Sequence, residues 1–143
     1  MPDIDIVIVN YMSAAHTINS VGDALKVAAH AGVSATVIVI NNGADNADFE
    51  RNIPSAGNVI VQNNPANIGF GAACNQGAAC GASDIILFLN PDATLKPAAL
   101  KTCLEAFRNP RNEHLGAIGP EITDGSGNLV RSCSRLPTRR DLL

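Results

Sequence analysis

The chain has few aromatic residues, few charges and no long apolar run, and each shortage excludes a class of protein. Phe, Trp and Tyr make up 3% of the 143 residues and Trp is absent, which argues against an aromatic-rich binding surface. Charged residues account for 16% and the net charge is −3, so we expect no nucleic acid among the partners. No apolar run approaches the roughly 20 residues that cross a bilayer, and the acidic N-terminus lacks the positive region of a signal peptide. These absences indicate a soluble protein of a reducing compartment.

The usual arrangement of zinc ligands is also missing. The four cysteines are Cys74, Cys80, Cys103 and Cys133. No two of them have C-x-x-C spacing and none has a histidine nearby, which argues against a zinc site. The first three lie in apolar helical patterns, so we expect them to be small buried residues.

What the sequence does contain is an alternation of strand-like and helix-like segments. Short apolar runs, several of them rich in β-branched residues, predict strands over 4–9, 35–40, 58–61, 84–89 and 115–118. Apolar residues at helical spacing predict helices over about 14–31, 69–81 and 97–107, with one or two further turns within 44–52. We expect Ser13 to cap the first helix and Gly32 to end it. A hairpin is expected within 121–132, around a turn at 124–127.

This alternation predicts an α/β fold with a mostly parallel sheet and flanking helices. The length suits a single domain over residues 1–143. In parallel sheets, ligands bind beyond the carboxyl ends of the strands. Polar segments follow four of the predicted strands: Asn10-Tyr11, Asn41-Asn42, Asn63-Asn64 and Asn90-Pro91-Asp92. We therefore expect one crevice that brings Asn10, Asn41, Asn67 and Asp92 together.

The stretch NPANIGFGAACNQG, residues 64–77, nearly matches the dinucleotide fingerprint G-x-G-x-x-G/A, and Asp92 follows at about the required distance of roughly 20 residues. Three features argue against a dinucleotide. Residues 62–68 separate the motif from the preceding strand, Cys74 stands where the third glycine should be, and two strand–helix units come first. Another phosphate ligand could rest on the amides near Gly69 and Gly71. The alternative without a ligand is that the glycines serve close helix packing.

The segment Asn90-Pro91-Asp92 favours a phosphate ligand with a metal ion. As a bare tripeptide it is an ordinary turn. After the apolar run DIILFL, which we expect to form a buried strand, it holds a carboxylate at the ligand edge of the sheet. A divalent cation that one or two carboxylates share with substrate phosphates needs little more from the protein.

Taken together, these motifs resemble the nucleotide-binding half of inverting family-2 glycosyltransferases with the GT-A fold, in particular the rhamnosyltransferase-like branch. The matching segments, which cover most of the chain in the right order, are VIVNY (7–11), VIVINN (37–42), NIGFGAACNQG (67–77), LFLNPDATLKP (87–97) and GAIGPEITDGSGNLVRSCSRLPT (116–138).

The resemblance implies a site for a nucleotide-diphosphate sugar, by similarity a dTDP- or UDP-sugar. The implied binding residues are Asn10, Tyr11, Asn41, Asn42, Asn67, Gly69, Phe70, Gly71, Asn75, Asn90 and Asp92. Asn41 stands where the family usually has an aspartate that contacts the base, which puts the base preference in doubt. The D-x-D metal motif appears as Asn90-Pro91-Asp92, so Asp92 is implied as the main protein ligand of Mg²⁺ or Mn²⁺.

The implied activity is metal-assisted, inverting transfer of a sugar, rhamnose in the nearest branch, to a hydroxyl of a glycan or lipid-linked acceptor in polysaccharide biosynthesis. This implies a cytoplasmic location, either free or peripheral at the inner face of the membrane. The general base is expected beyond residue 143, because the ending LPTRRDLL has no stop signal and reads as the middle of a longer domain. These residues alone are therefore expected to bind the donor without useful transfer. The alternatives are an NAD(P)-dependent oxidoreductase and a non-catalytic nucleotide-binding remnant.

Overall fold

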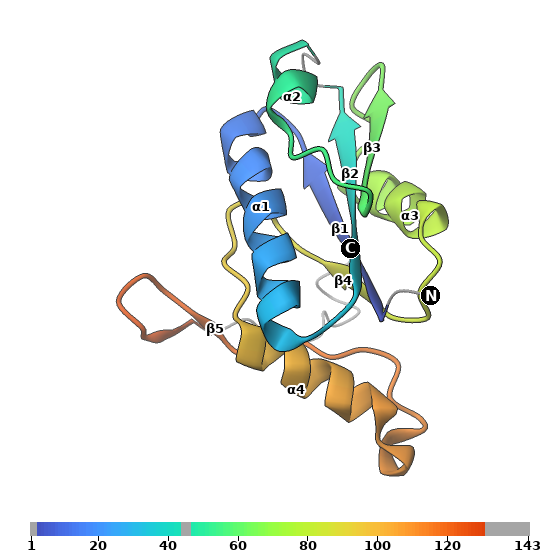
Figure 1. Cartoon of the computed structure of the whole chain (residues 1–143), viewed down its shortest axis with the longest axis vertical. Coiled ribbons are helices and arrows are strands. Elements are labelled where there is room, and N and C mark those ends of the chain that lie inside the picture. The colour runs from blue at the N-terminus through green and yellow to red at the C-terminus, as the bar shows by residue number, and fades with distance from the viewer. Residues whose placement is uncertain (1–2, 44–46, 131–143) are drawn as a thin grey trace, which may run out of the picture. The chain divides into compact units, whose positions relative to one another are not determined.

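A computed structural model describes residues 3–43 and 47–130 (Figure 1). The chain divides into two compact units, one ending at Thr102 and the other beginning at Cys103. Helix α4 (Pro97–Arg108) begins in the first unit and ends in the second.

The first unit is built on a parallel sheet of four strands in the order β3-β2-β1-β4. The strands are β1 (Ile4–Asn10), β2 (Ala35–Asn42), β3 (Val59–Asn64) and β4 (Ile86–Phe88). Every residue of β1 is buried, as its unbroken β-branched run predicts. The predicted α/β class with a parallel sheet is confirmed.

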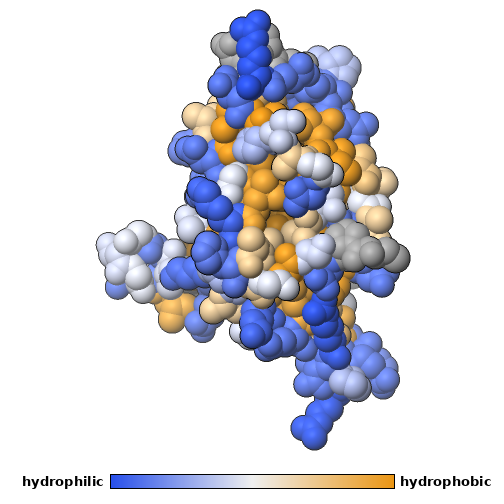
Figure 2. Space-filling model, in the orientation of Figure 1, coloured by the Kyte–Doolittle hydropathy of each residue, from blue (hydrophilic) through white to orange (hydrophobic). Residues whose placement is uncertain are grey.

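Two helices cover opposite faces of this sheet. Helix α1 (Ala14–Ala31) reaches the sheet through Thr17, which bonds to Asn10 of β1. Helix α3 (Phe70–Cys80) lies against Val7, whose side chain points to the other face, because residues three apart on a strand face opposite ways. A short helix, α2 (Ala47–Asn52), lies between β2 and β3 in the chain. Figure 2 shows apolar surface over the sheet beside α1, which fits the half-exposed strand β3.

The predicted C-terminal end of α1 at Gly32 is confirmed, whereas the predicted capping of its N-terminal end by Ser13 is only partly correct. Gly32 ends the helix in the left-handed conformation, with φ of 66°, and its N–H bonds to the carbonyl oxygens of Ala28 and Ala29. Ser13 occupies the N-cap position but makes no capping hydrogen bond. The Ser13 hydroxyl donates to Asn10 instead.

Two of the strand predictions are wrong in detail. β4 is three residues long, and Ile86 and Phe88 are 37% and 50% exposed, so this is a short edge strand and not a fully buried one. Among the described strands it pairs with β1 alone, which leaves its other edge without a partner. The strand predicted at 115–118 does not form, and these residues have no regular structure. An apolar β-branched run becomes a strand only where a neighbouring strand takes its backbone hydrogen bonds.

In the second unit, α4 ends and is followed by the 3₁₀ helix η1 (Pro110–Asn112) and the predicted hairpin, β5 (Ile122–Thr123) with β6 (Leu129–Val130). The apolar stripe of α4 is confirmed by buried Leu100 and Leu104. Within residues 3–43 and 47–130, no helix combines the length and apolarity needed to cross a bilayer.

The hairpin turn is organised by Asp124, which gives a pH-dependent prediction. Backbone and side-chain hydrogen bonds from Asn128 lower the pKa of the Asp124 carboxyl, with further bonds from Ser126 and Gly127. Because the pKa is lowered in the folded turn, the ionised carboxylate stabilises the turn at every pH above the pKa of a free aspartate. This stabilisation is lost as the pH falls through the lowered pKa. We expect the amide signals of Ser126 and Asn128 in NMR spectra to titrate together in acid, with a midpoint below that of a free aspartate. Asp124→Asn should abolish the titration; a midpoint at or above the free value would contradict the assignment.

Candidate functional site

The described part of the first unit has a hollow of about 460 Å³ at the carboxyl ends of its strands. Its walls come from the ends of β1 and β2 and from the loops that follow β1, β3 and β4. The lining residues are Val9, Tyr11, Ser13, His16, Asn42, Asn67, Phe70, Asn90, Pro91 and Asp92. Three loops that are distant in sequence therefore meet where ligands of parallel sheets bind.

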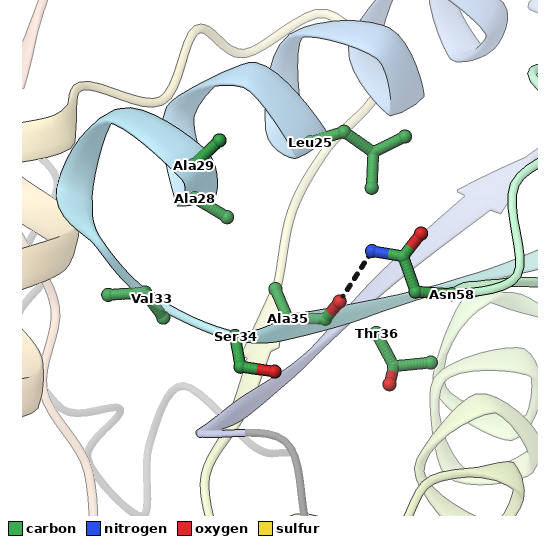
Figure 3. Close-up of a pocket in the computed structure, with 8 residues that line it drawn as sticks. All are labelled: Leu25, Ala28, Ala29, Val33, Ser34, Ala35, Thr36 and Asn58. Carbon is green, nitrogen blue, oxygen red and sulfur yellow. Dashed lines mark hydrogen bonds between the residues drawn. The ribbon is translucent and has the colours of Figure 1, made fainter.

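A second hollow of similar size, about 480 Å³, lies beside the C-terminal half of α1 and the start of β2 (Figure 3). Leu25, Ala28, Ala29 and Val33 form its apolar wall. Asn58, the amide in this groove, donates from Nδ2 to the carbonyl oxygen of Ala35 at 2.9 Å. None of its eight described lining residues has a side chain that titrates, so the chemistry is assigned to the first hollow.

A row of asparagines lies behind the hollow on the α1 face of the sheet. Asn10 Nδ2 donates to Asn41 Oδ1 at 2.8 Å, and Asn41 Nδ2 donates to Asn63 Oδ1 at 3.0 Å. Asn63 in turn donates to the Glu50 carboxylate at 2.6 Å. The three asparagines are register partners on β1, β2 and β3. Asn10 and Asn41 are 0% exposed and do not line the hollow, so their side-chain amides serve the sheet.

The same row explains why Ser13 does not cap α1. Asn10 Oδ1 accepts from the backbone N–H of Ser13 at 3.3 Å, from its hydroxyl at 3.2 Å and from the Thr17 hydroxyl at 3.0 Å. The Ser13 hydroxyl is thus turned toward Asn10, and no side chain caps the first amides of α1. Asn10 anchors the beginning of the helix, and the amides of the first turn stay available.

A second cluster of side-chain amides, on the α3 face of the sheet, connects β2 to the glycine-rich loop that precedes α3. Asn42 Nδ2 donates to Asn67 Oδ1 at 2.8 Å, and Asn42 Oδ1 accepts from the Ile68 N–H at 3.1 Å. Asn67 Oδ1 also accepts from the Gly69 N–H at 2.8 Å. Asn64, a strand residue that the sequence analysis placed in the loop, joins the cluster through Asn42 at 3.1 Å. β2 and β3 are longer than predicted because these amides pair across them.

Beyond this loop, helix α3 starts without a side-chain cap. Gly69 holds the N-cap position with φ of 89°, and the first turn contains no acidic residue. Phe70 lines the hollow with 59% of its surface exposed. The beginning of α3 therefore offers free amides beside the hollow, as an anion site requires.

The predicted site residues divide into three groups. Those that line the hollow are Tyr11, Asn42, Asn67, Phe70, Asn90 and Asp92. Asn10 and Asn41 are buried behind it, and Gly69, Gly71 and Asn75 are exposed on or next to the first turns of α3 without lining it. The expected meeting of Asn10, Asn41, Asn67 and Asp92 around one crevice therefore holds for Asn67 and Asp92 alone. His16 also lines the hollow and was not predicted from the sequence, although its place in the first turn of the first helix put it at the ligand edge.

The donor set of the hollow fits a divalent metal shared with a phosphate ligand. Asp92 and Asn90 are exposed side chains of the loop after β4, and Asp92 is the single carboxylate among the lining residues. Within the described residues, no group of three or more His, Cys, Asp or Glu side chains could hold an ion by itself. One carboxylate with a neutral amide oxygen suits Mg²⁺ or Mn²⁺ when phosphate oxygens complete the coordination.

A parallel sheet with α1 and α3 on its faces, and with loops that converge on a hollow at its carboxyl edge, is an α/β fold of the GT-A type. The sequence matches the model of glycosyl transferase family 2 over residues 5–140, and the chain belongs to that family.

Comparisons with individual proteins agree with this family. An N-acetylglucosaminyl-diphospho-decaprenol L-rhamnosyltransferase of Mycobacterium tuberculosis is 28% identical over 115 residues, which cover 72% of this chain and 36% of the relative. The chain thus spans about a third of the length of this curated relative. The mannosyltransferase PcManGT of Pyrobaculum calidifontis, solved with GDP-Man and Mn²⁺, superposes with a TM-score of 0.61 at 12% identity, covering 76% of this chain and 33% of that one. For S. aureus TarS 1–349 with UDP-GlcNAc, the TM-score is 0.55 at 16% identity, covering 84% of this chain and 40% of that one.

Proposed function

We propose that this chain is the donor-binding part of a glycosyltransferase that moves a sugar from a nucleoside diphosphate to an acceptor hydroxyl. The observation that carries the proposal is the hollow itself, where the Asp92 carboxylate, exposed aromatic rings and the uncapped start of α3 meet. A sugar nucleotide has matching parts: a flat base, a diphosphate and a metal ion that the diphosphate binds. Membership of family 2 supports the same assignment.

Each wall of the hollow takes a role in this proposal. Tyr11, 49% exposed, offers a ring to the nucleoside. The loop that Asn42 and Asn67 hold, together with the start of α3, receives the diphosphate. Asp92 holds the divalent metal, with Asn90 as a weaker neutral ligand.

In the transfer step, the acceptor oxygen attacks the anomeric carbon from the side opposite the diphosphate, which inverts the configuration. The bond from the anomeric carbon to the diphosphate oxygen breaks, and its electron pair leaves with the nucleoside diphosphate. A metal bound at Asp92 supplies positive charge where this negative charge develops. The acceptor proton goes to a general base. We propose that this base lies outside residues 1–143.

Rhamnose is the proposed sugar, with a dTDP- or UDP-linked donor and a lipid-linked acceptor. The support is the M. tuberculosis relative, an N-acetylglucosaminyl-diphospho-decaprenol L-rhamnosyltransferase. A cytoplasmic protein working at the inner face of the membrane would meet both substrates. The comparisons do not favour the dinucleotide-dependent oxidoreductase, and NADH titration gives a direct check: we expect no binding where UDP or dTDP with Mn²⁺ binds.

The metal assignment is tested with Asp92→Ala. We expect the parent chain to bind UDP or dTDP more tightly when Mn²⁺ is present, and the variant to lose this enhancement, by about tenfold or more, because its hard-cation ligand is gone. Asn90→Ala is the matched control on the same loop and should lose less, since it removes a neutral oxygen. Both residues are exposed, so the free energy of unfolding should change by no more than about 0.5 kcal/mol. Calorimetry that gives equal Mn²⁺-dependent affinity for Asp92→Ala and the parent would refute the assignment.

A further inference from the structure

His16 is the third residue of α1, and its exposed side chain lines the hollow. The donor-site motifs do not include it. Of the ten lining residues, it alone has a side chain that can carry a positive charge, because the lining contains no lysine or arginine. The other titratable side chains there are the Asp92 carboxylate and the Tyr11 phenol.

A nucleoside diphosphate in this hollow needs more positive charge than a metal ion on Asp92 provides. The carboxylate that holds the metal offsets part of its charge, so the diphosphate is left incompletely neutralised. Glycosyl transfer then adds negative charge to the leaving group. Proteins usually neutralise phosphate charge with arginine or lysine. The described lining of this hollow contains neither, and His16 is the lining residue that can replace them.

The His16 imidazole is free to meet a ligand. Among the described residues it makes no hydrogen bond and no ion pair, with Asp92 included. Its own helix adds to its suitability, because no side chain caps α1 and no acidic residue lies in the first turn. An anion at His16 would meet a ring N–H close to the N-terminal end of α1, where the helix dipole also favours negative charge.

We propose that His16 is a diphosphate-binding residue, whose imidazole N–H donates to a phosphate oxygen of the sugar nucleotide. This rests on the proposed donor site and names a contact on the wall that α1 contributes. Asp92 would hold the metal ion that the diphosphate shares, and His16 would supply the N–H donor that arginine or lysine provides in other phosphate sites.

The test compares His16→Ala with His30→Ala, which removes another exposed imidazole from the same helix, far along the chain from the hollow. Titrations with Mn²⁺ use UDP and dTDP, followed by uridine and thymidine, whose weak binding is measured by ligand-observed NMR. We expect His16→Ala to weaken diphosphate binding about tenfold, the typical value of a hydrogen bond to a charged group. Nucleoside binding should change less than about twofold, and His30→Ala should match the parent throughout. His16→Lys should keep diphosphate affinity within about threefold of the parent, because an ammonium group also donates to phosphate.

The outcomes separate this inference from the donor-site proposal. If the parent binds UDP or dTDP and His16→Ala binds them equally well, His16 makes no such contact and the inference is wrong. If His16→Ala loses the nucleosides as strongly as the diphosphates, His16 contacts the nucleoside, and the inference is again wrong. If the parent binds no nucleoside diphosphate at all, the donor-site proposal fails and takes this inference with it.

Discussion

Replacing Gly43 with alanine is expected to lower the free energy of unfolding by about 2–4 kcal/mol and to weaken nucleotide binding. Gly43 has φ of 80°, a conformation that L-residues adopt only with strain. A Cβ at this position would also overlap the backbone N of Asn67 and lie 2.5 Å from the carbonyl carbon of Ala66. Backbone atoms cannot turn aside as a side chain can, so the loop that precedes α3 has to move. Urea unfolding measures the first effect and calorimetry with UDP or dTDP the second.

Gly32→Ala is the matched control for this variant. Gly32 also has positive φ, 66°, but a Cβ there would meet nothing within 4 Å. Its loss should therefore reflect backbone strain alone, about 1 kcal/mol, with nucleotide affinity unchanged. The difference between the two variants isolates the contact between the end of β2 and the loop at Ala66 and Asn67. Equal destabilisation by Gly43→Ala and Gly32→Ala would show that the loop at Ala66 and Asn67 does not pack against Gly43.

The second large effect is expected at Gly77, where α3 lies directly on the sheet. A Cβ at Gly77 would lie 2.5 Å from Val7 Cγ1 and 3.3 Å from Ile40 Cγ1, both in the buried core of the sheet. Since valine has little rotamer freedom, the helix has to shift away, and such overpacking costs about 1–3 kcal/mol. We expect Gly77→Ala to lower the free energy of unfolding by that amount in urea titrations.

Gly71→Ala, on the same helix, separates packing from helix propensity. A Cβ at Gly71 would meet nothing within 4 Å, so alanine there should stabilise the chain by up to about 1 kcal/mol. Opposite signs for the two variants would show that close packing on the sheet requires glycine at position 77 and not at position 71. A gain in stability for Gly77→Ala would contradict the close contact.

The sequence analysis predicted the elements whose cause is local. The buried strand β1, the end of α1 at Gly32, the start of α4 at Pro97 and the turn of the hairpin each follow from nearby residues: a β-branched run, a left-handed glycine, a proline and an Asp–Gly turn. Local stretches of sequence also located the glycine-rich loop and the Asp92 segment at the ligand edge.

Elements that depend on a distant partner were predicted less well. β3 continues to Asn64 because Asn63 and Asn64 pair with asparagines of β2, and no rule of local propensity favours asparagine in a strand. β4 and residues 115–118 were both expected to be strands, yet only β4 pairs with a neighbouring strand, and the glycine and alanine in LGAI (115–118) favour a strand less than the residues of β4 do. Strand propensity is in large part the availability of a partner, and the partner lies elsewhere in the chain.

The sequence by itself determined the fold class and which loops reach the site, since both follow from the order of the apolar runs and of the polar segments that follow them. Which side chains enter the hollow was decided only by the tertiary structure. Asn41 and Asn42 are adjacent, but neighbours on a strand point to opposite faces: Asn41 is buried in the row with Asn10, while Asn42 lines the hollow. His16 reaches the hollow because one helical turn separates Ser13 from it and Asn10 anchors that turn. The face of the sheet to which a side chain points, and the side chain with which it bonds, are fixed only when the strands and helices pack. Residues of the same type, such as Asn41 and Asn42, therefore have different roles.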